Sequence, residues 1–586
     1  MSTADITDSL ERLTRHTHKL TRLVTEQLVL KAAALVVLYL AVTPFIFVIW
    51  TSFWTGRIGS LDGAFTLQNY VQMYSSAEVY LLFINTLTIT LGMFAIAMTG
   101  GVAMSWLIGR TNIPTKGYLE LVILAPYAIP SFIYALMFIF AFSPQAGLVN
   151  HYWMELGFET SLFNIYTVWG ILVVMGIDAV TTVYLITIPS LTNLDPNLEE
   201  SSRIHGANML ETIRRISLPV VVPSLASAGV IVLIRGIGTF ASVAVIGVRF
   251  GFDVFATRIW EVTSQQYPPN YGYATALSVT LILVTGFLIL TYRRITKRKE
   301  DYMVVTGEGY RPSTWDLGKW KWPITVGVWC VMVFVWIIPI LIVFIASFHT
   351  LWAGEIELSK VTLRHYATVL SSDSRFWKGM SNTLVISFWA AIFGTTLVTL
   401  AAYYTERTQY RLRGVVDFFL IAPMAFPGII LGTSVLITYL FFNNLFGISI
   451  LGTIWIIVIG VTTNDLPTTS RIAIGNIVQI HKELEEMARI SGANWLEQMR
   501  SVFMPLYKGT LGILLFYWFI GATKTLTIPL MLYVGSTEPI SVYLFGAWYF
   551  QANFEAVAVI SVIFMGLMGV ILASLKIFNI KFYELV

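Results

Sequence analysis

Charged residues are concentrated in one short stretch that occurs twice in the chain. Residues 198–219, LEESSRIHGANMLETIRRISLP, contain three glutamates, three arginines and a histidine, although only 12% of all residues are charged. Residues 484–505, LEEMARISGANWLEQMRSVFMP, are identical to this stretch at 12 of 22 aligned positions. Apolar segments flank both copies closely. Glutamates and arginines at such fixed spacing can form ion pairs with each other or with a charged partner.

Each copy predicts two short helices joined at a glycine. Asp195–Pro196 is a typical helix start, and Gly206 can take the left-handed conformation that ends a helix. Asn208 followed three residues later by Glu211 forms a capping-box pattern, which starts a second helix. The second copy repeats this pattern around Gly492, although it lacks the Asp-Pro start. Two such elements related by a two-fold axis suit a partner that is itself a dimer.

Ionisable residues also lie inside apolar runs, where a charge is costly and by default marks a pathway or a binding site. Asp178 lies in one such run, with Asn464 and Asp465 at the matching place in the second half of the chain. Arg235 and Lys524 lie in another matching pair of runs. Two cations facing a shared cavity favour an anionic substrate, whereas the alternative is an ion pair of either cation with Asp178 or Asp465. The predicted substrate-pathway residues are Asp178, Arg235, Thr239, Asn464, Asp465, Lys524 and Thr525.

The composition of the whole chain is that of a polytopic membrane protein. Its 586 residues are 56% hydrophobic, with a mean hydropathy of +0.73. Several apolar runs exceed the roughly 20 residues that a helix needs to cross a bilayer. They lack strand-period alternation, so they predict an all-α fold and not a barrel. The net charge of +4 comes from basic residues that flank these runs, which indicates no nucleic-acid partner.

Twelve apolar runs predict about twelve transmembrane helices. The positive-inside rule places the basic residues that flank these runs in the cytoplasm, together with both charged elements and both chain termini. These residues are Arg110 and Lys116, RRITKRK at 293–299, and RTQYRLR at 407–413, which begins at Arg407. The first run has no cleavage site for a signal peptide after it. The runs lie near residues 28–50, 80–108, 118–142, 164–188, 219–246, 273–292, 323–347, 381–404, 414–441, 450–473, 507–533 and 556–578.

The two charged elements belong to a larger internal repeat. NTLTIT at 85–90 matches NTLVIS at 382–387, and LAPYAIP at 124–130 matches LIAPMAFP at 420–427. Because each half has six predicted spans, the two repeats insert in the same orientation. An 11-residue difference in the third outward loop is expected to explain why the early and late offsets differ. The predicted organisation is an N-terminal cytoplasmic segment at 1–27, a first repeat at 28–292 with its charged element at 195–219, a cytoplasmic linker at 293–322, and a second repeat at 323–586 with its element at 482–505.

The spacing Glu200-x5-Gly206-x9-Ile216-x-Leu218-Pro219 resembles the EAA motif of binding-protein-dependent ABC importer permeases. The second copy, Glu486-x5-Gly492-x9-Val502-x-Met504-Pro505, is similar but departs from the family pattern at its last positions. The first copy has two serines where the family usually has two alanines. With two motif copies and twelve predicted spans, the chain resembles the fused permeases of the ferric-iron, thiamine, polyamine and phosphonate group of type I importers.

This resemblance implies a transport subunit and not an enzyme. Each motif would be a coupling helix that docks on one of two copies of a cytoplasmic ATPase, which would hold ATP and Mg, whereas this chain would hold no cofactor and no metal. An extracytoplasmic binding protein would deliver a small solute to this chain, which would let it cross the inner membrane. Glu200 and Glu486 would face the ATPase, and the alternative is that they pair with Arg203 or Arg489. The implied coupling residues are Glu199, Glu200, Arg203, Gly206, Ala207, Glu485, Glu486, Arg489, Gly492 and Ala493.

An ion-coupled secondary transporter with two parallel six-span halves is the alternative function. It predicts ion-coupling residues at the membrane midplane and no docking element, so the twin motif argues against it. The iron-type relatives often have an acidic residue directly after the lysine, whereas this chain has Thr525 there. That difference disfavours a bare ferric ion and leaves a phosphonate-like or other anion, or an iron complex, as the substrate.

Overall fold

The computed structural model describes residues 3–60, 62–192, 199, 201–202, 204–297, 314–371 and 375–577. These residues form helices and loops with three isolated bridges and no strand. The all-α prediction is therefore confirmed for the part of the chain that the structure describes. Four of the residues singled out in the sequence, Asp195, Pro196, Glu200 and Arg203, lie outside the described residues.

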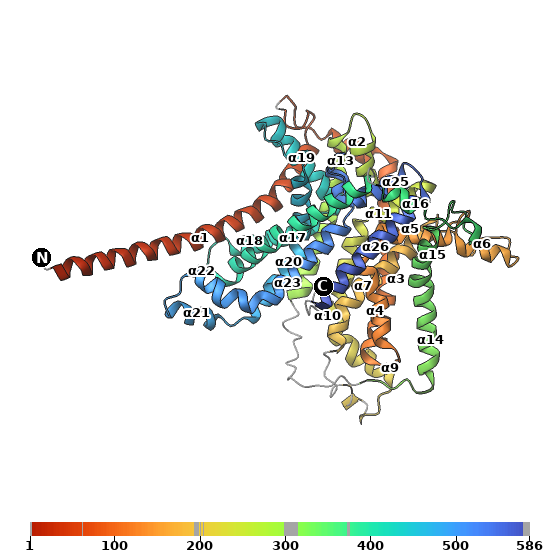
Figure 1. Cartoon of the computed structure of the whole chain (residues 1–586), viewed down its shortest axis with the longest axis horizontal. Helices are drawn as coiled ribbons and strands as arrows, with labels where there is room; N and C mark the ends of the chain where they lie inside the picture. Colours follow the sequence, from red (N-terminus) through yellow and green to blue (C-terminus); the bar gives the residue numbers. More distant parts are fainter. Residues whose placement is uncertain are drawn as a thin grey trace.

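The first half contains helices α1 to α13 (Figure 1). Its predicted N-terminal segment is continuous with the first span in a single long helix, α1. The helices are α1 (Thr3–Ser52), α2 (Gln68–Ser75), α3 (Ala77–Arg110), α4 (Lys116–Ala128), α5 (Ser131–Phe142), α6 (Leu148–Glu155), α7 (Val168–Thr192), α9 (Met209–Thr212), α10 (Leu218–Ile237), α11 (Ala241–Ile246), α12 (Phe255–Trp260) and α13 (Tyr271–Lys297), with a π-helical turn, η1 (Ile213–Ser217), between α9 and α10.

The second half repeats this order from α14 onward. A π-helical turn, η9 (Met499–Phe503), occupies the place that η1 holds in the first half. The helices are α14 (Lys321–Met332), α15 (Ile338–Ala346), α16 (Arg364–Val369), α17 (Arg375–Arg407), α18 (Arg413–Ile421), α19 (Gly428–Phe446), α20 (Ile454–Gln479), α21 (Lys482–Ile490), α22 (Trp495–Gln498), α23 (Met504–Lys524), α24 (Thr527–Leu532), α25 (Ile540–Tyr549) and α26 (Phe554–Ile577).

When helices are counted by their length and apolar composition, fewer than the twelve predicted spans are found among the described residues. Among the described residues, ten helices are long and apolar enough to cross a membrane, and the bent pair α4–α5 makes up to eleven. Pro130 starts α5 after a bend of 107°, because proline cannot donate a backbone hydrogen bond to the preceding turn. The predicted run 450–473 does form the long helix α20, but this helix contains Asn464 and Asp465 and is too polar to count as an apolar span.

The two halves are built alike and exchange their first spans. In the first half α3 packs against α7 and α10, and in the second half α17 packs against α20 and α23. Helix α1 crosses to the second half, where it packs against α17 and α19, and α15 packs against α5 of the first half. The two halves form bundles that diverge toward the ends that carry α9 and α21 (Figure 1). We call the side of the molecule at these ends the motif face.

The 11-residue difference between the halves lies in a different loop from the one predicted. Helix α6 is inserted between α5 and α7, whereas residues 447–453 join α19 directly to α20 without a helix. This is the second of the predicted outward loops and not the third. The third loops, at 247–270 before α13 and 533–553 before α26, differ by only three residues.

The repeated Asn-Thr pair of the NTL sequences fastens a short helix in each half. The Asn85 amide donates to the Asp253 carbonyl at 2.8 Å, and the Thr86 hydroxyl accepts the backbone N–H of Phe255, the first residue of α12, at 3.3 Å. A backbone donor at the start of a helix has no partner inside that helix, so a side chain of another span satisfies it here.

The second half uses the matching pair in the same way. The Asn382 amide donates to the carbonyls of Ser536 and Glu538, both at 3.0 Å. The Thr383 hydroxyl accepts the N–H of Ile540, the first residue of α25, at 2.8 Å. The sequence repeat therefore marks a structural fastening between α3 and α12 and between α17 and α25.

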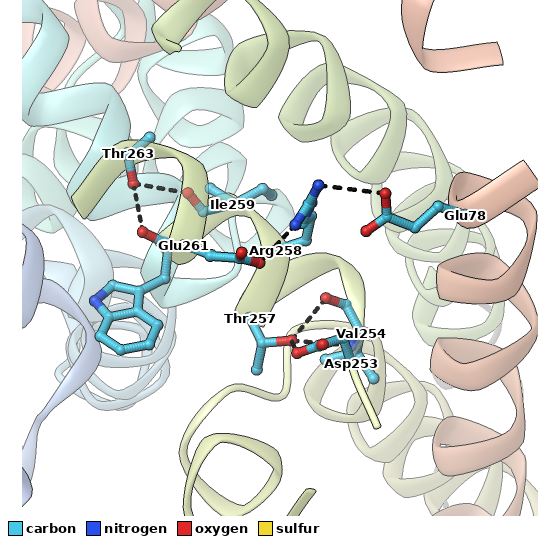
Figure 2. A network of polar contacts seen from close by, with 9 residues as sticks. Glu78, Asp253, Val254, Thr257, Arg258, Ile259, Glu261 and Thr263 are labelled. Carbon is cyan, nitrogen blue, oxygen red and sulfur yellow. Dashed lines mark hydrogen bonds and ion pairs between the residues drawn. The ribbon is translucent and has the colours of Figure 1, made fainter. Parts of the chain in front are cut away.

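An ion-pair network reinforces this fastening in the first half (Figure 2). The Arg258 guanidinium of α12 reaches Glu78 at the start of α3 at 3.2 Å and Glu261 at 2.7 Å. In the second half Arg375, at the start of α17, pairs with Glu538 at 2.7 Å and lies over the Tyr543 ring. The residue at the start of the long helix is acidic in α3 (Glu78) and basic in α17 (Arg375). In both halves it still has a partner of opposite charge.

The end of the predicted linker is attached to the first half. Trp315 donates its backbone N–H to the Arg110 carbonyl at 2.8 Å and accepts that of Asn112 at 3.1 Å. The Asp316 carboxylate accepts the Gly318 N–H at 3.0 Å and the Asn112 amide at 2.6 Å. These hydrogen bonds hold the pKa of Asp316 below its ordinary value. The carboxylate therefore stays ionised, and the attachment persists, at neutral pH.

We expect Asn382→Ala to destabilise the second half, because two carbonyls beside α25 lose their donor. The expected loss is about 1–3 kcal/mol, seen as a lower midpoint of thermal unfolding in detergent. Asn443→Ala is the matched control, since the Asn443 amide donates only to the adjacent Asn444. Equal midpoints for the two variants would show that the fastening contributes nothing.

Candidate functional site

The second charged element folds as two short helices, α21 and α22, joined at Gly492, as predicted, and the described part of the first element has the same turn at Gly206 followed by α9. Gly206 and Gly492 have φ angles of +86° and +91°, in the left-handed region that favours glycine. The residue after each glycine, Ala207 or Ala493, donates its N–H back to the preceding helix, at 3.1 and 3.0 Å. This pattern satisfies carbonyls at the helix end and is a common helix terminus.

The second helix of each element begins with the predicted capping box. In the first copy the Glu211 N–H donates to the Asn208 side chain at 2.9 Å, and the Asn208 N–H donates to the Glu211 carboxylate at 3.1 Å. Asn494 and Glu497 make the same two hydrogen bonds at 2.9 and 2.6 Å. The turn is therefore fixed by local hydrogen bonds in both halves.

Each element presents large apolar side chains to solvent on the motif face. Ile204 is 84% exposed, and Ile490, at the same place in the second copy, is 86% exposed. Met487 on α21 is 65% exposed. Glu486 and Arg489 are also exposed, and the structure shows no ion pair between them. A helix with exposed isoleucine and methionine beside unpaired charges is a surface that a partner protein can cover.

The first glutamate of each element is buried and does not belong to this surface. Glu199 pairs with Arg110, the last residue of α3, and the two side chains are 1% and 0% exposed. Glu485 pairs with Arg407, the last residue of α17, at 3.1 Å. The Ser217 hydroxyl also donates to Glu199 at 2.7 Å. Glu199 and Glu485 were expected among the coupling residues, but they anchor the element to the membrane helices.

Arg110 and Arg407 also donate hydrogen bonds to the end of the helix that precedes the motif in each half. Arg407 donates to the carbonyls of Ile477 and Ile480, at and just beyond the end of α20, at 2.9 and 2.6 Å. Arg110 donates to the Leu191 carbonyl near the end of α7 at 3.4 Å. Each arginine therefore joins three parts of its half: the long span, the helix before the motif, and the motif itself. We call the pairs Arg110–Glu199 and Arg407–Glu485 the motif anchors.

A continuous helix connects each motif to the interior of the molecule. In the first half α9, η1 and α10 follow one another without a break, and Arg235 lies near the far end of α10. In the second half α22, η9 and α23 do the same, and Lys524 is the last residue of α23. A displacement of the motif is therefore transmitted to these two cations through one stiff element.

Arg235 and Lys524 line a cavity of about 340 Å³ between the two halves, together with Asp178, Asn464 and Asp465. The Arg235 guanidinium pairs with the Asp178 carboxylate at 3.0 Å and donates to the Thr182 hydroxyl. Thr525 lines the same cavity. The other predicted threonine, Thr239, lines an adjoining hollow that shares Asp178 and Arg235 with the cavity. The seven predicted pathway residues are therefore brought together.

The charges that line the cavity are paired in one half only. Arg235 has the predicted intramembrane ion pair with Asp178. Lys524 has no carboxylate within ion-pair distance among the described residues, and its ammonium donates to the Tyr127 carbonyl at 2.8 Å and lies 4.0 Å from the centre of the Tyr127 ring. Asp465 accepts the Asn464 amide at 2.7 Å.

The comparisons with known proteins agree with this arrangement. Residues 101–301 match the family model of the binding-protein-dependent transport system inner membrane component. This match includes the first motif, its anchor and α10. Residues 101–301 are therefore similar to this family. The family model was matched over the first half only, but the second half repeats the motif, the anchor and the capping box.

Two ferric transport system permease proteins, of Haemophilus influenzae and Actinobacillus pleuropneumoniae, are each 26% identical to this chain, over 405 and 396 residues. The alignments cover 68% and 66% of this chain but only 60% and 55% of the two relatives. The sulfate transport system permease protein CysT of Escherichia coli is 24% identical over 192 residues, which are 33% of this chain and 66% of that protein.

Sequence reasoning missed the arginines of the motif anchors. Arg110 and Arg407 were interpreted only as basic residues that flank a span, although they end two matching spans, 297 residues apart like the NTL sequences. That shared offset is the signal that could have identified them. Tyr127 and Thr182 at the cavity were also missed, and no sequence pattern distinguishes them from other apolar-run residues. Among the described residues, no group of three His, Cys, Asp or Glu side chains could hold a metal ion.

We expect Glu485→Gln to destabilise the chain, because the buried Arg407 loses its counter-charge. Leaving one partner of a buried ion pair alone costs about 3–5 kcal/mol. The measurement is the midpoint of thermal unfolding in detergent. Glu486→Gln is the control, since it changes the same residue type one position away on the exposed surface. If both variants unfold at the wild-type midpoint, the anchor is not a stabilising interaction.

Proposed function

We propose that this chain is the membrane-spanning permease of an ABC importer, with both halves fused in one polypeptide. It gives alternating access to a small solute across the inner membrane and hydrolyses no ATP itself. The observation that carries this proposal is the direct helical connection from each exposed motif to a charged residue of the shared cavity. A force applied to the motifs acts on both sides of the cavity at once.

The proposed partners on the motif face are two copies of a cytoplasmic ATPase, which hold ATP and Mg. Two like elements require two like docking grooves, and a dimer of ATPase subunits supplies them. Ile204 and Ile490 provide the apolar contact, while Glu486, Arg489 and the expected Glu200 and Arg203 provide the charged rim. This places both chain termini in the cytoplasm. An extracytoplasmic binding protein delivers the solute at the opposite side.

The motif anchors determine how the movement is transmitted. Because Arg407 holds the motif, α17 and the end of α20 together, these parts move as one body when the motif is displaced. The same holds for Arg110 in the first half. When the ATPase dimer closes, the two motifs approach each other and the cavity opens to the other side of the membrane.

The names of the relatives give two substrate classes, a ferric iron species and an oxyanion. A bare ferric ion is disfavoured here, since Arg235 and Lys524 both line the cavity and repel a cation. An iron complex or a phosphonate-like anion remains compatible with these two cations. The ion-coupled secondary transporter is the rival function, and it offers no explanation for two matching elements that expose an isoleucine on the motif face.

The experiment that tests the proposal is uptake in proteoliposomes that contain the chain, the ATPase and the binding protein. Uptake that requires ATP supports the importer. Uptake driven by an ion gradient without the ATPase would replace it with the secondary transporter. The genes beside the coding sequence identify the two partner proteins, and the ligand that co-purifies with the binding protein identifies the solute.

We expect Gly206→Val and Glu486→Lys to leave the permease folded and inserted but to reduce ATP-driven uptake at least tenfold. Valine at a φ of +86° is strained by about 1–3 kcal/mol and changes the docking surface, and lysine reverses a charge on that surface. The measurement is uptake together with co-purification of the ATPase. Arg57→Gln, which changes an exposed residue of another loop, is the control. Wild-type uptake by both motif variants would refute the docking role.

A further inference from the structure

The cavity between the halves contains as many acidic as basic side chains. Asp178 and Asp465 line it together with Arg235 and Lys524. In each half the acid and the base come from corresponding helices, α7 with α10 and α20 with α23. The cavity as a whole is therefore close to neutral, and it is not the purely cationic site that two basic residues alone would make.

The two halves differ in whether their charges meet. In the first half Arg235 closes on Asp178 at 3.0 Å, so these two charges already satisfy each other. In the second half Lys524 reaches a neutral carbonyl and an aromatic ring, and Asp465 reaches a neutral amide. Among the described residues, neither has an opposite charge within ion-pair distance. A charge left without a counter-charge in an apolar interior is costly and is typical of a ligand site.

A glycine explains why the second pair stays open. When the two motifs are aligned, Gly521 takes the place of Arg235, and Lys524 lies three residues further along the helix. A Cβ at Gly521 would lie 2.9 Å from a carboxylate oxygen of Asp465. The Asp465 carboxylate therefore faces a position that carries a cation in the first half and has no side chain here. The carboxylate lies close against the Gly521 backbone, and both residues line the cavity.

We propose that the solute that crosses this cavity is a small zwitterion, with its oxyanion group bound by Lys524 and its ammonium group bound by Asp465. The proposal rests on the importer function and names its substrate class. A simple anion would satisfy Lys524 but would meet the Asp465 charge, and a simple cation would meet the reverse conflict. Only a solute with both charges satisfies both groups. A cavity of about 340 Å³ admits a solute of a few heavy atoms.

The test is equilibrium binding to the full-length chain in lipid nanodiscs, without the ATPase or the binding protein. The zwitterionic probes are β-alanine, taurine and aminoethylphosphonate. Their singly charged analogues are propionate, ethanesulfonate, ethylphosphonate and ethylammonium, and ferric citrate and sulfate represent the classes named for the relatives. We expect at least one zwitterion to bind about tenfold more tightly than its analogues, a difference of about 1.4 kcal/mol.

Two variants are expected to shift the ligand preference in opposite directions. Lys524→Met removes a cation, so it should abolish the preference for the zwitterion and shift it toward ethylammonium. Asp465→Asn removes an anion, so it should shift the preference toward the oxyanion analogue. A purely structural role of either residue would lower all affinities together and would not reverse their order. Arg57→Gln, which does not line the cavity, should bind the probes like the wild type.

Three outcomes would overturn the proposal. The first is that sulfate, ferric citrate or a singly charged analogue binds as tightly as the zwitterions or more tightly. The second is that both variants keep the wild-type order of affinities. The third is that no zwitterion binds at millimolar concentration. Because the assay contains no ATPase, loss of zwitterion binding would leave the importer function standing. Conversely, zwitterion binding together with uptake that needs no ATP would refute the importer function and keep the site.

Discussion

A buried charge must have a counter-charge close by, and the two motif anchors follow from this constraint. Arg110 and Arg407 end long apolar helices at positions where water does not reach them, and Glu199 and Glu485 compensate their charge. Arg110 also donates to one carbonyl, and Arg407 to two, at the end of the neighbouring helix. Separating the motif from its half would expose an unpaired guanidinium in the interior, which is prohibitive. The motif is therefore an integral part of the bundle and not a loose loop.

The anchor explains why some side chains of the motif are buried while their neighbours are exposed to solvent. Of two adjacent glutamates in the second copy, Glu485 points inward to the anchor and Glu486 points outward to solvent. Successive residues of a helix are about 100° apart, so adjacent identical residues face different surroundings. One side chain can then hold the element to the membrane helices while its neighbour remains available to a partner. The exposed isoleucines lie on the same outward surface.

Local features could be predicted from the sequence, whereas long-range contacts could not. The left-handed glycines, the capping boxes and the proline break before α5 depend on residues a few positions apart, and each follows from backbone sterics or local hydrogen bonding. The anchors and the Asn-Thr fastenings join residues far apart in the chain, so they were visible only as unexplained matches of the repeat. The count of spans failed at α20, because the polar residues that line the cavity lower its hydropathy.

The two halves are alike at the motifs and their anchors, and they differ at the cavity. The anchors, the capping boxes and the fastenings are present in both halves, as expected if the proposed ATPase dimer displaces both bodies alike. In the cavity the halves differ: Arg235 closes on Asp178, while Gly521 leaves Asp465 open and Lys524 lies one turn further along. A symmetric cavity would present two equivalent sites to one asymmetric solute. The symmetry is broken at the matching positions Asp178/Asn464, Arg235/Gly521 and Gly238/Lys524. One pair of opposite charges is left open, and the proposed solute would bind it in one orientation.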